Sequence, residues 1–163
     1  MSNDQSLQEI LMAIPWFQQL SQDHLGLLAD FSHLVEVPQG KDLFKEGEGE
    51  DFLYIVINGR ISIEFYAPGR GRISIYTAEP MDVVGWSSVT PVVRQRTASA
   101  RAVLDSRLIA MDALSLRRLC EGDCALGCIV MRRIANVVAQ RLLVTRLQLL
   151  DLFANPEHQE AHA

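Results

Sequence analysis

The longest stretch without a helix-breaking residue lies near the C-terminal end of the chain. Between Cys124 and Phe153 there is no proline, and Gly127 is the last glycine, so 30 residues can continue as one helix. At 1.5 Å per residue, such a helix would be roughly 45 Å long. Pro156 follows it. A helix of this length would extend beyond a small core, so it needs a second surface to pack against.

Apolar residues follow this predicted helix in two stripes. The first alternates spacings of three and four, as the a/d seam of a coiled coil does. It consists of Cys128, Met131, Ala135, Val138, Leu142, Thr145, Leu149 and Leu152. The second lies beside it and consists of Val130, Ile134, Val137, Val144 and Leu147. We predict that one stripe packs on the chain's own core and the other on a second copy, so that residues 124–153 form a homodimer interface. The alternative is one broad apolar face on one large core.

Residues 33–111 show a pattern typical of strands. An apolar run of strand length covers residues 52–57, and Asn58-Gly59 follows it as a strong hairpin signal. A second turn, Pro68–Gly71, lies between two alternating segments. Turns at this spacing predict an antiparallel β-roll or jelly-roll barrel.

Short helices are expected before and after this roll. Residues 4–30 have helical periodicity interrupted by Pro15, and Ser21 is a candidate N-cap for a second helix. Asp112 is a candidate N-cap for helices over 112–153, and a polar tail covers 154–163. The 163 residues suit one domain over 1–163, mainly β with flanking helices, an α+β fold.

Composition and charge exclude several classes of function. The net charge of −5 is unlike that of a nucleic-acid-binding domain. Without an apolar run of about 18 residues or a signal peptide, we expect a cytoplasmic protein with no membrane segment. The sequence shows no nucleophile–base constellation, so we expect a binding module and not an enzyme.

The order of these elements resembles the cyclic-nucleotide-binding domain of the CRP/FNR regulator superfamily, over about residues 5–153. The block formed by Lys45-Glu46-Gly47, residues 52–56 and Asn58-Gly59 carries this resemblance. It implies a small-molecule sensor for a cyclic nucleotide such as cAMP or cGMP, or a related anionic phosphorylated ligand, with no cofactor required. Members of the superfamily continue into a DNA-binding helix-turn-helix. This chain ends ten residues after Phe153. We therefore expect a stand-alone sensor without direct DNA binding, acting on an unidentified protein partner.

The resemblance also points to a phosphate-binding cassette. The residues that match its two halves are Gly85, Trp86, Ser87, Ser88 and Val89, and then Arg96, Thr97 and Ala98. The start of a short helix and the planar double donor of an arginine suit a phosphate. By the same resemblance, Thr145 matches the position that contacts the base. These nine residues are the predicted ligand site.

Trp86 is the main departure from the family pattern. The family has a glutamate at this position, which accepts a hydrogen bond from the ribose 2′-hydroxyl. An indole has one donor and no acceptor. The phosphate side of the site is therefore predicted to be present and the ribose side altered. The alternative is that Trp86 fills the pocket and the chain is a dimeric interaction scaffold without a ligand.

Three cysteines suggest a third, weaker hypothesis. Cys120, Cys124 and Cys128 are spaced by four, so on one continuous helix they would share a face and could form a redox or metal sensor. Gly122 is expected to break the helix between the first two. Sulfur at apolar-periodic positions is more often buried packing, so no metal ligand is predicted.

Overall fold

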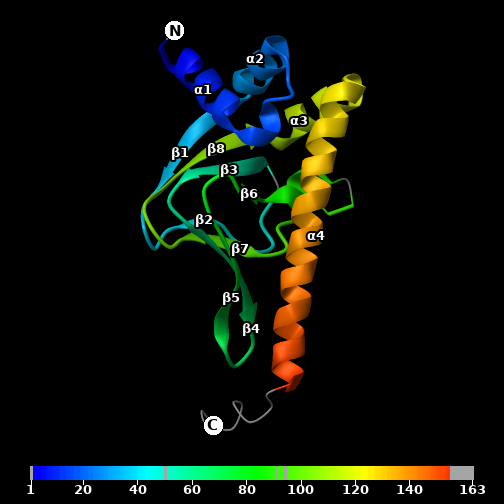
Figure 1. The fold of residues 1–163 in the computed structure, drawn as a ribbon. Helices are drawn as coiled ribbons and strands as arrows, with labels where there is room; N and C mark the ends of the chain where they lie inside the picture. The colour runs from blue at the N-terminus through cyan, green and yellow to red at the C-terminus, as the bar shows by residue number, and fades with distance from the viewer. Residues whose placement is uncertain (1, 50, 91, 94, 155–163) are drawn as a thin grey trace.

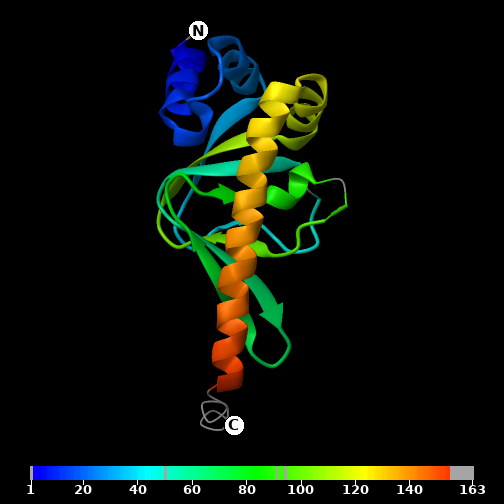
Figure 2. The same cartoon turned by 45° about the vertical axis from the view of Figure 1, so that its right-hand side comes forward.

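The computed structural model describes residues 2–49, 51–90, 92–93 and 95–154. Short helices α1 (Ser2–Ala13), η1 (Pro15–Phe17) and α2 (Gln22–Asp30) lie at one end of the molecule (Figure 1). A strand-rich body follows them. Helices α3 (Ala113–Gly122) and α4 (Cys124–Ala154) end the described chain, and α4 runs along the whole side of the body (Figure 2).

The strands of the described residues form two four-stranded antiparallel sheets. The first has the order β1 (Ser32–Val37), β8 (Ser106–Asp112), β3 (Phe52–Asn58) and β6 (Val83–Val84). The second has the order β2 (Asp42–Phe44), β7 (Ser99–Ala102), β4 (Ile61–Ala67) and β5 (Gly71–Ala78). The predicted α+β class and antiparallel roll are confirmed. The roll is not a closed barrel, because within the described residues no strand pairing joins the two sheets into a ring.

The turn at Asn58-Gly59 is present, but it does not make the predicted hairpin. It joins β3 of the first sheet to β4 of the second. The reason lies at Ser106, whose hydroxyl accepts from the Arg60 amide at 3.1 Å and contacts the Arg60 carbonyl at 3.2 Å. A Cβ on Gly59, whose φ is +89°, would run into Ser106. Glycine is therefore needed here for a close crossing between sheets. The predicted turn at residues 68–71 does form a hairpin, between β4 and β5.

The predicted helix starts are confirmed. The Ser21 hydroxyl accepts from the His24 amide, and the Asp112 carboxylate accepts from the Ser115 amide at 2.7 Å. The chain breaks between α3 and α4 at Asp123, whose carboxylate accepts from the Leu126 amide at 2.9 Å. Hydrogen bonds from the side chain and amide of Ser115 lower the pKa of Asp112, and the bond from the Leu126 amide lowers the pKa of Asp123, because they favour the ionised carboxylate.

Adjacent residues of the first sheet contribute to two different cores. Ile109 packs with the helices on one face of the sheet, together with Leu11, Leu28 and Leu126. Leu108 points the other way, into the space between the two sheets. This alternation gives the β-sheet one face for the helices and one face for the interior of the roll.

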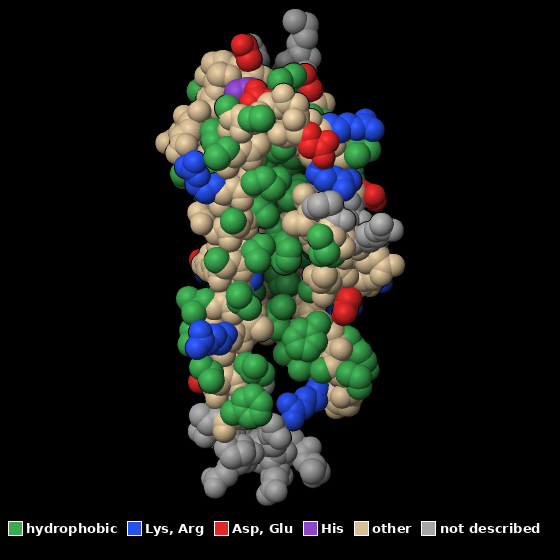
Figure 3. All heavy atoms as spheres, turned by 90° about the vertical axis from the view of Figure 1, so that its right-hand side faces the viewer, with side chains coloured by type: hydrophobic (Ala, Val, Ile, Leu, Met, Phe, Trp, Pro, Cys, Tyr) green, Lys and Arg blue, Asp and Glu red, His purple; other side chains and the backbone are tan. Residues whose placement is uncertain are grey.

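The two stripes of α4 have different environments. Val130, Ile134 and Val137 of the second stripe are buried on the body, although Leu147 at its end is exposed. Along the a/d seam the side chains are exposed except for half-buried Val138; Leu152 lies outside the described side chains. Figure 3, which faces α4, shows hydrophobic side chains gathered in a band down the molecule. In the part of the chain that the structure describes, no helix is long and apolar enough to cross a membrane.

Candidate functional site

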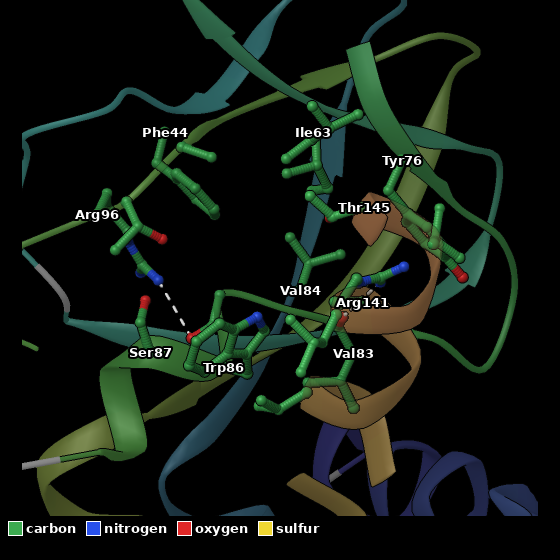
Figure 4. Close-up of a pocket in the computed structure, with 17 residues that line it drawn as sticks. Phe44, Ile63, Tyr76, Val83, Val84, Trp86, Ser87, Arg96, Arg141 and Thr145 are labelled. Atoms are coloured by element: carbon green, nitrogen blue, oxygen red, sulfur yellow. Dashed lines mark hydrogen bonds between the residues drawn. The ribbon is translucent and has the colours of Figure 1, made fainter. Parts of the chain in front are cut away.

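A cavity of about 320 Å³ opens between the second sheet, the short helix η2 (Trp86–Val89) and α4. This volume lies at the lower end of the range for small-ligand pockets. Figure 4 shows Arg96 and Ser87 on one side of the cavity, Arg141 and Thr145 on the opposite side, and Trp86 between them. Most of the remaining lining is apolar, from residues such as Phe44, Ile63, Val84 and Val138.

Arg96 is a buried cation held by backbone carbonyls. Only 3% of its surface is exposed. Nη2 donates to the Phe52 carbonyl at 2.7 Å, and Nη1 donates to the Gly85 carbonyl at 3.3 Å. The guanidinium carbon lies 4.1 Å from the centre of the Phe44 ring and 5.7 Å from that of Tyr54. These contacts fix the plane of the guanidinium at the cavity wall.

Gly85 makes the approach of Arg96 possible. Its φ of +75° lies in the left-handed region, and an added Cβ would run into Arg96 Nη1. Its carbonyl also accepts from the amide of Ser88 at 3.1 Å and from the Ser88 hydroxyl at 2.8 Å. Glycine is therefore required twice at this position, for its backbone conformation and for its lack of a side chain.

The turn at residues 45–48 positions the backbone of Arg96. The Arg96 amide donates to the Glu48 carbonyl at 2.9 Å, and the Gly47 amide donates back to the Arg96 carbonyl at 2.9 Å. The Lys45-Glu46-Gly47 block carried part of the family resemblance. In the structure, the turn that contains it holds the backbone of Arg96 in place through these two hydrogen bonds.

Trp86 lines the cavity without closing it. The residue is half-buried, and one side packs against the core between the helices and the first sheet. The cavity lies beside it. Among the described lining residues there is no carboxylate, so nothing in that set replaces the glutamate of the family pattern.

The opposite wall contains a stacked pair that the sequence did not single out. The Arg141 guanidinium carbon lies 2.9 Å from the centre of the Tyr76 ring, and Nη2 donates to the Val83 carbonyl at 3.5 Å. Tyr76 in turn donates to Asp82 at 2.8 Å. Burial raises the pKa of Tyr76 and lowers that of Arg141. In the sequence, Arg141 precedes Thr145 by four residues, which places the two on the same face of α4.

Seven of the nine predicted residues line this one cavity: Gly85, Trp86, Ser87, Arg96, Thr97, Ala98 and Thr145. They come from η2, the segment before β7, and α4, so residues about 60 positions apart in the sequence meet here. Ser88 and Val89 lie behind the wall. The Ser88 hydroxyl bonds to the Gly85 carbonyl, and Val89 packs in the core between the helices and the first sheet.

The cysteines do not form a metal site within the described chain. No group of three or more His, Cys, Asp or Glu residues among the described positions could hold a metal ion. The break between α3 and α4 separates Cys120 from the other two, as expected. The expectation of buried packing was wrong for Cys124 and Cys128, which are exposed.

Known proteins show the same domain. The family model of the cyclic nucleotide-binding domain matches residues 34–123. A CRP-like cAMP-activated global transcriptional regulator of Mycobacterium tuberculosis is 31% identical over 147 residues, which cover 90% of this chain and 63% of that protein. This chain thus spans less than two thirds of the length of that relative.

Solved structures agree on the fold. A cyclic nucleotide-binding domain from Methylobacillus flagellatus superimposes with a TM-score of 0.74 at 21% identity, covering 92% of this chain and 84% of that one. The sensor domain of the regulator DNR from Pseudomonas aeruginosa gives a TM-score of 0.73 at 21% identity, covering 87% and 95%. The family model covers more than half of the chain and shows that it belongs to the cyclic nucleotide-binding domain family.

Proposed function

We propose that this chain is a non-enzymatic regulatory domain that binds a cyclic nucleotide in the cavity beside Trp86 and signals as a homodimer. The observation that carries the proposal is the open cavity with Arg96 fixed in its wall. The M. tuberculosis relative is described as activated by cAMP, which makes cAMP the first candidate ligand. The signal would pass to a protein partner in the cytoplasm.

The phosphate is proposed to lie on the side of Arg96 and Ser87. A guanidinium whose plane is fixed in advance loses little freedom on binding, and a planar fork matches two phosphate oxygens. The apolar lining around it lowers the local dielectric and strengthens the attraction.

The sugar and base are proposed to lie toward Trp86 and α4. The indole offers a flat face on which a ring can stack. Because no carboxylate stands among the described lining residues, the ribose 2′-hydroxyl should contribute little to affinity. Thr145 is exposed and lies on both the cavity lining and the seam, so it is placed to contact the base.

The exposed a/d seam supports a homodimer through residues 124–153. The sequence did not indicate which stripe is free of the body; in the structure the a/d seam is the exposed one, and α4 extends over 31 residues. A second copy laid in parallel along this seam would cover Leu142 and Leu149, which are 70% and 53% exposed in one chain. Ligand contacts to α4 would then bias the arrangement of the two helices.

The open cavity favours ligand binding over the ligand-free scaffold. In the scaffold hypothesis the indole fills the pocket. Here about 320 Å³ lies beside the indole. That space is enough for a small ligand.

Isothermal titration of the purified protein with cAMP and cGMP, side by side, tests the proposal. We expect saturable heat with one site per chain and a preference for one of the two nucleotides. An absence of heat with both, at ligand concentrations into the millimolar range, would contradict it. Adenosine serves as the control, because it lacks the phosphate and should not bind measurably.

A further inference from the structure

The three cysteines differ in environment. Cys124 and Cys128 are exposed on α4, whereas Cys120 on α3 is half-buried. All three line a second cavity, of about 670 Å³, between α3 and α4. Burial, with the charges of Glu121 and Asp123, raises the pKa of the Cys120 thiol to about 11. Cys120 is therefore protonated at neutral pH and a poor nucleophile.

The two exposed cysteines extend the a/d seam to the first residue of α4. Cys124 precedes Cys128 by four residues, and Met131 follows three residues later, so the alternation of four and three begins at Cys124. Cys124 takes one core position and Cys128 the next. In a parallel pair of helices, each such residue faces its own counterpart on the other helix.

The distance across such a pair suits a disulfide bond. Packed helix axes lie about 8–10 Å apart, and Cα atoms lie about 2.3 Å from each axis. Directly facing Cα atoms are then separated by roughly 3.4–5.4 Å, and the upper part of this range overlaps the roughly 4.4–6.8 Å that disulfides need. Arg132 lies one helical turn after Cys128, and its Nη2 donates to the Cys128 sulfur over 3.6 Å. This contact holds the Cys128 side chain at the surface of the helix.

We propose that Cys128, with Cys124 in the adjacent layer, is a thiol-oxidation site at which two copies of this chain become covalently joined. The inference rests on the proposed homodimer. Hydrogen peroxide oxidises one Cys128 thiol to a sulfenic acid, with release of one water. The thiol of the partner's Cys128 attacks that sulfur, forms the S–S bond and releases a second water. Two electrons pass from the thiols to the peroxide.

The bond would fix one end of the paired helices and leave the ligand end free. Cys128 and Thr145 are 17 residues apart on one helix, which corresponds to about 25 Å. The disulfide bond would therefore hold the dimer together without changing the proposed nucleotide cavity.

The test compares three forms of the reduced protein after treatment with hydrogen peroxide: wild type, Cys120→Ser and the double variant Cys124→Ser/Cys128→Ser. On non-reducing gels, wild type and Cys120→Ser should give the same yield of a covalent dimer, which dithiothreitol removes. The double variant should give at least tenfold less. Sedimentation and thermal unfolding of the untreated double variant check that it still folds and pairs.

The outcomes separate this inference from the proposed function. An untreated protein that sediments as a dimer but forms no covalent dimer would overturn the oxidation site and leave the homodimer standing. A monomer would overturn both. A covalent dimer that persists in the double variant would assign the cross-link to Cys120 and would also overturn the inference.

Discussion

The two sides of the cavity beside Trp86 are constructed differently. On one side, Arg96 is almost fully buried, bonded to two carbonyls and stacked on Phe44. On the other side, Trp86 is half-buried and Thr145 is exposed on a helix that leaves one face uncovered. The first side is complete within one chain. The second side borders the exposed face of α4, so the fold of one chain fixes the proposed phosphate site more strictly than the proposed sugar and base site.

This difference separates recognition of the phosphate from selection among nucleotides. A rigid, buried cation recognises any suitably placed phosphate. In the proposed binding mode, the open side would decide which sugar and base are accepted, and it is the side where Trp86 departs from the family pattern. The following predictions probe each side, starting with the largest expected effect.

Removing the cation should abolish binding. Arg96→Ala removes two charge-assisted hydrogen bonds to phosphate, each about 1.5–3 kcal/mol, so cAMP affinity should fall at least about 100-fold. Arg96→Lys retains the charge without the planar fork and should bind with intermediate affinity. Thermal unfolding of each variant separates lost binding from lost folding. A folded Arg96→Ala protein with unchanged cAMP affinity would contradict the proposal that Arg96 binds the phosphate.

Adding a methyl group at Gly85 should damage the same side through its geometry. Gly85→Ala is strained at a φ of +75° and also meets Arg96, whereas Gly69→Ala has nearly the same φ, +80°, with no atom within 4 Å. The left-handed conformation alone costs about 1–2 kcal/mol. Chemical denaturation should therefore show a loss of about this size for Gly69→Ala and a clearly larger one for Gly85→Ala. Equal losses would mean that Arg96 adapts easily.

Placing a carboxylate at position 86 should increase discrimination for the ribose 2′-hydroxyl. Wild type should bind cAMP and 2′-deoxy-cAMP with affinities within about twofold of each other. Trp86→Glu should prefer cAMP by roughly tenfold, because its carboxylate accepts from the 2′-hydroxyl. Trp86→Phe is the control, since it also lacks an acceptor. A wild-type protein that already discriminates strongly would show that another group reads the ribose.

Changing the base contact should have the smallest effect. Thr145→Ala removes one exposed hydroxyl, and such a hydrogen bond contributes about 0.5–1.5 kcal/mol net. The ratio of cAMP to cGMP affinity should change by about two- to twelvefold, and Thr145→Ser should restore it. A change above about 30-fold would mean that Thr145 is enclosed in the complex, which would favour a site completed by the second copy.

Sequence reasoning succeeded where the signal was local. The spacing between Gly85 and Arg96 predicted that these two residues lie at one site, and both line the same cavity. Ser21 and Asp112 cap helices through hydrogen bonds to nearby amides, as predicted. Helical periodicity also divided the apolar residues of α4 into two stripes, and the structure exposes most of one and buries most of the other. The periodicity did not indicate which of the two would be buried.

It failed where distant contacts override a local pattern. Asn58-Gly59 reads as a hairpin, but the turn packs on Ser106, 46 residues after Arg60, and directs the chain to the other sheet. The Tyr76–Arg141 stack joins residues 65 positions apart. Residue spacing does not predict such a pair, because Tyr76 and Arg141 meet only through the way α4 packs along the roll.

The most direct test of the central claim uses the indole in the cavity as a reporter. The chain has two tryptophans, so Trp16→Phe leaves Trp86 as the only one. Titration of this variant with cAMP should change the Trp86 emission saturably, with the same affinity as the heat of binding measured on wild type. Heat of binding without a change in Trp86 emission would place the ligand outside this cavity and contradict the account.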